Sequence, residues 1–156
     1  MIYSGRTGGS HLTHSGGGAN YVCMPLDPVY GRHRSGVQGE GYMFGSEYER
    51  PIVGRHNHNV PCAVCFATTR GAVLMIPAKT SCPPSWTKEY GGYLMSERHN
   101  HQRTMHVCVD SSQESIPGSH TDINGALFYH IEAHCDGMAC PPYDPQKELT
   151  CVVCTI

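Results

Sequence analysis

Cysteine is the feature of this sequence that most constrains its fold. Nine cysteines occur in 156 residues, while charged residues make up only 15% and glycine occurs 18 times. This combination is typical of proteins that fold in an oxidising compartment and are held together by disulfides. We therefore expect a secreted, extracellular protein with one unpaired or intermolecular thiol, because the count is odd. The cysteines are Cys23, Cys62, Cys65, Cys82, Cys108, Cys135, Cys140, Cys151 and Cys154.

Two cysteine pairs have C-x-x-C spacing, in PCAVC (61–65) and TCVVC (150–154). This spacing occurs in zinc sites, redox centres and disulfide frameworks. The intervening Ala-Val and Val-Val favour extended strands, in which positions i and i+3 point to opposite faces. One zinc ion cannot easily take both thiolates, and no helix follows either pair, as redox chemistry of the thioredoxin type requires. We therefore expect each of these cysteines to form a separate disulfide, with zinc and redox sites as the alternatives.

Short segments rich in β-branched, aromatic and apolar residues indicate strands, and no window has the apolar periodicity of an amphipathic helix. The apolar runs 61–67 and 72–77 predict central strands covered on both faces, while 125–135 alternates between an apolar and a more polar face. We expect one all-β domain over residues 1–156. Its predicted architecture is compact, disulfide-stapled and sandwich-like, with short antiparallel strands and long polar loops.

Charge and hydropathy exclude several classes of function. The formal net charge is −2 and no basic stripe occurs, which argues against a nucleic-acid partner. No apolar run approaches the length of about 18 residues that a membrane-spanning helix needs. The nucleophile motif G-x-S-x-G is absent, and no Ser, His and Asp residues have a diagnostic spacing. We therefore expect neither an enzyme nor a membrane-spanning protein.

Several polar segments carry the carboxylate and amide oxygens that calcium prefers. GSEYE (45–49) offers two glutamates, NHN (57–59) offers two asparagines, and the loop 111–125 offers further donors. No EF-hand pattern occurs, and Asp and Asn also stabilise turns through their own backbone, which is the alternative explanation. The candidate metal ligands are Glu47, Asn57, Asn59, Asp122 and Asn124.

Histidine and tryptophan provide further candidates. His56 and His58, like His99 and His101, form H-x-H pairs that suit zinc or copper, although exposed loop histidines explain them more simply. Trp86 is the single tryptophan, and it either stacks on a sugar ring or fills the core. Asn20 follows three glycines and either stabilises that turn or belongs to a binding site. The candidate ligand-binding residues are His58, His120, Asn20 and Trp86.

Seven long or unusual strings span essentially the whole chain. They are YSGRTGGSHLTHSGGGANYVCMPLDPVY, SGVQGEGYMFGSEYE, HNVPCAVC, AVLMIPAKTSCPPSWTKEYGGYLMS, CVD, ESIPGS and NGALFYHIEAHCDGMACPPYDPQKELTCVVC. Through these strings the chain resembles one family of secreted invertebrate proteins. The family includes a calcium-dependent, galactose-binding lectin of sea anemones and the non-collagenous end domains of sponge-type short-chain collagens.

The resemblance to the lectin implies a β-rich homo-oligomer that binds terminal galactose through calcium. The collagen relatives imply self-assembly and attachment to matrix components instead. Related sequences carry an upstream Arg-Trp-Gly-Arg-Thr-x-Cys segment, which would supply a tenth cysteine. Relatives also often have Asp where this chain has Asn57, Asn59 and Asn124. If these positions bind calcium, we expect weaker binding here, because neutral amides attract a divalent ion less than carboxylates do.

Overall fold

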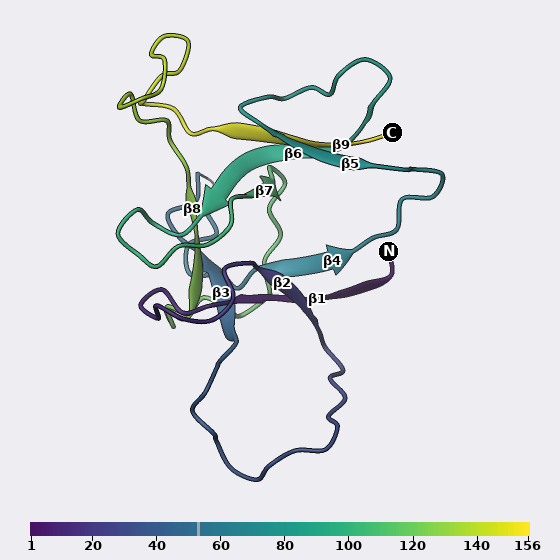
Figure 1. Ribbon diagram of the computed structural model, residues 1–156, viewed down its shortest axis with the longest axis vertical. Helices are drawn as coiled ribbons and strands as arrows, with labels where there is room; N and C mark the ends of the chain where they lie inside the picture. Colours follow the sequence, from purple (N-terminus) through teal and green to yellow (C-terminus); the bar gives the residue numbers. More distant parts are fainter. Residues whose placement is uncertain (53) are drawn as a thin grey trace.

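The computed structural model describes residues 1–52 and 54–156, which form strands and loops without a helix (Figure 1). The strands pair in the order β2-β1-β3-β8-β6-β9-β5, with β4 added to β1 and β7 added to β6. The predicted all-β class is therefore confirmed. The strands are β1 (Tyr3–Gly9), β2 (Val22–Pro25), β3 (Phe44–Tyr48), β4 (Pro61–Val64), β5 (Val73–Pro77), β6 (Thr87–Ser96), β7 (Val107–Asp110), β8 (Ala126–His130) and β9 (Thr150–Thr155).

The sheet curls so that two walls face each other. β1, β2 and β4 form one wall, β5, β6 and β9 form the other, and β3 and β8 join them (Figure 1). β3 and β8 run parallel, with Glu47 opposite Leu127. The sequence predicts antiparallel strands throughout, and this pair differs because a long crossover connects β3 to β8. The parallel pair determines which side chains meet on the face opposite the core.

The core lies between the two walls and contains Tyr48, Val60, Met95 and Phe128. Tyr21 stacks on Phe128 with ring centroids 4.1 Å apart. Its hydroxyl donates a hydrogen bond of 2.7 Å to the Leu127 carbonyl, so this aromatic ring can be buried without an unpaired polar group. The core thus fixes the β3–β8 junction from the inside.

β6 approaches β7 closely at a glycine. A Cβ atom on Gly92 would lie 1.8 Å from the carbonyl oxygen of Val109. Only glycine therefore allows β7 to pair with β6 in the observed register, in which Gly92 is opposite Asp110.

The two apolar runs expected to form central strands lie at edges instead. In the described part of the chain, β5 pairs with β9 alone and β4 pairs with β1 alone. Val73 in β5 is 72% exposed, so the predicted burial on both faces is wrong. Proline explains the difference, because Pro61 begins β4 and Pro77 ends β5. Proline cannot donate to a ladder and is therefore confined largely to edge strands and strand ends.

Four disulfides connect the strands and loops, as the cysteine content predicts. Two of them cross an intervening strand, because Cys23–Cys62 joins β2 to β4 and Cys108–Cys151 joins β7 to β9. Cys82–Cys154 fixes β9 from its other end, and Cys135–Cys140 closes a short loop. The two cysteines of the C-terminal C-x-x-C pair thus form separate disulfides, as expected. This number of disulfides indicates folding in an oxidising environment.

Cys65 corrects the prediction for the first C-x-x-C pair. Cys62 is paired, but Cys65 has a free, exposed thiol. The reason is that β4 ends at Val64, so Cys65 lies beyond the pairing that positions Cys62. Separately, none of the described residues forms a helix able to cross a membrane.

Candidate functional site

Two glutamates on β3 and its end face away from the core. Glu47 and Glu49 flank the core residue Tyr48, and alternation along the strand places both on the opposite face of the sheet. Their residues are only 2% and 6% exposed. Loops cover this face, which explains why both faces of β8 are buried, although the sequence predicts a polar, accessible face there. Leu127 is 1% exposed and Phe128 is 2% exposed.

Asp122 completes a group of three carboxylates with these glutamates. One carboxylate oxygen from each of Glu47, Glu49 and Asp122 lies within 4.8 Å of the others. We call these three residues the acid cluster. Asp122 is exposed, so the cluster is buried at the sheet and open to solvent at the loop.

The acid cluster has few groups that compensate its negative charge. Glu47 accepts the backbone N–H groups of Ile123 and Asn124, at 3.2 and 3.3 Å. Within the described residues, the ion-pair partner of Glu49 is His56, whose Nδ1 lies 3.4 Å from Oε2 and whose side chain is 56% exposed. The three carboxylates therefore have one solvent-exposed imidazole as an ion-pair partner in the described residues, and Arg50 adds a weaker attraction to Glu49.

Burial raises the pKa of both glutamates. For Glu47, burial outweighs the hydrogen bonds from the backbone of Asn124 and Ile123, which lower the pKa. For Glu49, burial outweighs the attraction of His56, and the neighbouring carboxylates raise the pKa further. A bound cation would supply the positive charge that the protein lacks at this point.

Two of the predicted asparagine ligands lie in the segment that pairs with β3. Asn59 forms an antiparallel bridge with Glu47, which puts their side chains side by side. Asn57 donates its N–H to the carbonyl of Tyr48, 2.9 Å away. The Oδ1 atom of Asn57 is buried and accepts no hydrogen bond from the described residues. A buried amide oxygen without a hydrogen-bond partner is a donor of the type that calcium binds.

The loop before β8 supplies the remaining predicted oxygen donors. The side-chain amide of Asn124 donates a hydrogen bond to Asp122 Oδ1, which restrains that carboxylate. The Asn59 N–H donates a hydrogen bond of 3.0 Å to Ser119 Oγ, and the Ile116 N–H donates one of 3.1 Å to the Asn59 carbonyl. These bonds hold the loop before β8 against Asn59, which pairs with β3. Oxygen donors that are far apart in the sequence are thereby brought close together.

The predicted ligand-binding residues are distributed unequally. The rings of His58 and His120 lie 5.9 Å apart, and His58 Nδ1 is buried without a hydrogen-bond partner among the described residues. Asn20 is exposed in the loop between β1 and β2. Trp86 is half-buried just before β6, whereas the far end of that ten-residue strand pairs with β8. The length of β6, about 30 Å when counted along the strand, lies between Trp86 and the end that pairs with β8.

The H-x-H pairs do not converge on a metal site in the described part of the chain. His56 pairs with Glu49, and His101 Nδ1 lies 2.8 Å from Glu97 Oε2. The described residues bring three or more metal-binding side chains together at the acid cluster, and none of these is a histidine. The geometry therefore favours a hard cation over zinc or copper.

Glu49 is the member of the acid cluster that the predicted ligand set leaves out. The sequence could have indicated Glu49, because it lies two positions after Glu47 in an extended segment and both carboxylates are therefore on one face. No family model matches the chain, and no solved structure matches it.

Proposed function

We propose that this protein is a secreted, lectin-like module that binds galactose-type sugars with the help of calcium. The observation that supports this most strongly is the acid cluster, in which two buried carboxylates and one exposed carboxylate lie together with His56 as an ion-pair partner. Such a group of like charges is unfavourable unless a cation joins it. The resemblance to a calcium-dependent lectin family supports the same cation.

The donors fit calcium by their chemistry and their spacing. Calcium binds oxygen ligands at 2.3 to 2.6 Å, so oxygens on one ion lie no more than about 5 Å apart. The acid cluster meets this limit, with oxygens within 4.8 Å of one another. The amide oxygens of Asn57 and Asn59 are further donors of the required type in the adjoining segment. Calcium takes six to eight ligands, which leaves positions for water or for sugar hydroxyls.

The open side of the acid cluster is the side on which a sugar would bind. Asp122 is exposed, and His120 is exposed beside His58. In this proposal two vicinal hydroxyls of the sugar replace water on the ion, while imidazole nitrogens read the orientation of neighbouring hydroxyls. The preference for galactose is inferred from the resemblance alone. The fold supports only the accessibility of the site, because the loop that carries Asp122 is polar and exposed.

Calorimetric titration with galactose tests this function. We expect binding in the presence of calcium, loss of binding after addition of a chelator, and recovery when calcium is restored. Asp122→Asn should weaken both calcium and galactose binding, because Asp122 is the exposed carboxylate of the cluster. Asp27→Asn is the matched control, since Asp27 is an exposed carboxylate in the loop after β2. Equal galactose binding with and without chelator contradicts the role of the ion.

A structural, self-assembling extracellular module is the second candidate. Its specific support is the exposed thiol of Cys65 next to Phe66, whose side chain is 71% exposed. Both lie at the end of the edge strand β4, where a second chain can reach them. Light scattering under non-reducing conditions should then show a covalent dimer that Cys65→Ser abolishes. If both the wild-type protein and Cys65→Ser are monomeric at high concentration, this candidate function is contradicted.

A further inference from the structure

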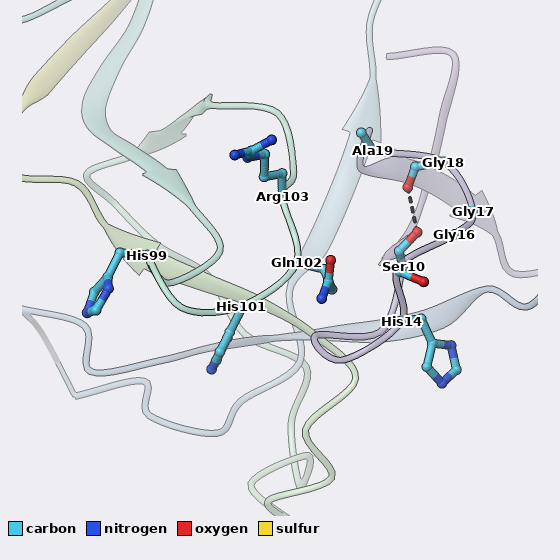
Figure 2. Close-up of a pocket in the computed structure, with 11 residues that line it drawn as sticks. Ser10, His14, Gly16, Gly17, Gly18, Ala19, His99, His101, Gln102 and Arg103 are labelled. Atoms are coloured by element: carbon cyan, nitrogen blue, oxygen red, sulfur yellow. Dashed lines mark hydrogen bonds between the residues drawn. The ribbon is translucent and has the colours of Figure 1, made fainter.

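A polar depression of about 550 Å³ lies between two loops and shares no lining residue with the acid cluster. The glycine-rich loop 10–19 forms one side and residues 99–103 form the other, with Gln102 between them (Figure 2). Two backbone hydrogen bonds hold the loops together. The Gln102 N–H donates a hydrogen bond of 2.9 Å to the Leu12 carbonyl, and the Met105 N–H donates one of 2.8 Å to the Ala19 carbonyl. The depression is therefore part of the fold.

The glycine-rich loop presents bare backbone to this depression. Gly17 has a φ of 98°, and a Cβ atom there would lie 2.9 Å from Ser10 Oγ, so the conformation requires glycine. Ser10 Oγ donates a hydrogen bond of 2.5 Å to the Gly18 carbonyl, which turns one acceptor away from the depression (Figure 2). The N–H groups of residues 16–19 donate to no backbone carbonyl in the described part of the chain. Backbone N–H groups that are free of intramolecular acceptors are available to bind an anion.

The charged groups around the depression are positive or can become positive. Arg103 lines it and has no carboxylate within ion-pair distance among the described residues. His14, His99 and His101 line it as well, and no Asp or Glu does. Glu97, the carboxylate behind His101, is 6% exposed and accepts hydrogen bonds from His101 and from the Leu127 N–H, at 2.8 and 2.7 Å. Its charge is therefore already compensated.

A second depression on the other side of the same loop provides a comparison. It shares Ser10, His14 and residues 15–17 with the first, but Glu40 lines it in place of Arg103. The unpaired guanidinium thus distinguishes the first depression electrostatically.

We propose that the depression between loops 10–19 and 99–103 binds an oxyanion of the sulfate type, either as inorganic sulfate or as a sulfate ester on a glycan. Figure 2 shows the Arg103 side chain pointing away from the glycine-rich loop, so this exposed side chain must rotate about its own bonds to donate two parallel hydrogen bonds to such a group. The N–H groups of residues 16–18 can then donate to its remaining oxygens. Gln102 and Ser10 are placed to contact a sugar that carries the ester (Figure 2). This site is separate from the acid cluster and does not require calcium.

Amide-resolved NMR titration in the presence of a chelator tests the proposal. The probes are inorganic sulfate, galactose 6-sulfate and unsulfated galactose. We expect both sulfated probes to shift the amide resonances of Gly16, Gly17 and Gly18 in a saturable manner. Tighter binding of galactose 6-sulfate identifies a glycan ester as the ligand, and equal binding identifies the free anion. No shift with either sulfated probe, or equal shifts with galactose, overturns the proposal.

Matched variants locate the site. Arg103→Gln should weaken sulfate binding about tenfold or more, because it removes a charge-assisted, bidentate contact. Arg70→Gln removes the same charge from an exposed position outside the depression and should change binding less than about twofold, apart from general screening. The spectra of both variants report directly whether each is folded. Equal affinities for the two variants contradict the assignment. Because the titrations are made in chelator, the result for sulfate does not depend on whether the acid cluster binds calcium.

Discussion

Replacing Glu49 by glutamine should stabilise the calcium-free protein and remove its response to calcium. Glu49 is the buried carboxylate of the acid cluster whose compensation is poorest, since His56 at 3.4 Å is its ion-pair partner in the described residues. Glutamine keeps the size of the side chain and removes its negative charge. Its amide can also donate hydrogen bonds to the neighbouring carboxylates.

The size of the effect follows from the spacing of the charges. At an effective dielectric constant of about 20, two like charges 4.8 Å apart repel each other by about 3.5 kcal/mol. Solvent around the exposed Asp122 reduces its share, and loss of the attraction to His56 opposes the gain. We therefore expect Glu49→Gln to raise the free energy of unfolding by about 1 to 3 kcal/mol without divalent ions.

Calcium should reverse this order. An ion that binds only the folded wild-type protein adds about 2.7 kcal/mol at a concentration 100 times its dissociation constant. Glu49→Gln loses a ligand and should gain little. Urea unfolding followed by the fluorescence of Trp86, the single tryptophan, measures both states at roughly pH 8, where ordinary carboxyls are ionised.

The control variant is Asp27→Asn, which removes an exposed carboxylate after β2 and should leave stability unchanged within about 0.5 kcal/mol in either condition. The reasoning is refuted if Glu49→Gln is less stable than the wild type in chelator, or if it keeps the full stabilisation by calcium.

Three further predictions concern stability. Burial raises the pKa of Glu47 and Glu49 above the ordinary value of 4.5. In chelator, the free energy of unfolding should therefore be highest below that pH and should fall as the pH rises through the raised pKa values. A urea series across pH should show this fall, and calcium should remove it. Eliminating Cys82–Cys154, which closes 72 residues, should cost about 4 kcal/mol, against about 2 for Cys135–Cys140, which closes 5. Paired serine variants in urea check that order, and equal costs would contradict it. Gly92→Ala should cost about 3 kcal/mol or more through its clash with β7, whereas Gly45→Ala, with open space around it, should cost less than about 1, as measured by urea midpoint.

Local sequence features predicted the all-β class and the disulfide scaffold. Short β-branched segments separated by Gly and Pro indicate strands wherever they occur. The opposite orientation of Cys151 and Cys154 follows from a spacing of three in an extended segment, and the structure confirms it with two separate partners. Neither prediction needs to know which strands are neighbours.

Features that depend on strand order could not be predicted in the same way. The apolar runs in β4 and β5 look central, but their position at an edge depends on pairings made elsewhere. Cys65 remains free because β4 ends one residue before it. The prolines that bound these strands, Pro61 and Pro77, were the available signal.

The candidate site was predictable only in part for the same reason. Glu47 and Asp122 were both candidate ligands from their chemistry, but their meeting depends on the parallel pairing of β3 with β8. The loop before β8 brings Asp122 to a glutamate 75 residues earlier in the chain. Glu49 joins them because it shares a strand face with Glu47, a relation that the alternation of the strand contains.

Crystallography with calcium and galactose, using anomalous scattering to locate the ion, tests whether the acid cluster binds calcium and presents it to a sugar. We expect one calcium peak in contact with Glu47, Glu49 and Asp122, with two galactose hydroxyls completing its coordination. An absence of anomalous signal at the acid cluster in millimolar calcium, or galactose bound elsewhere without an ion, would rule out this role of the acid cluster.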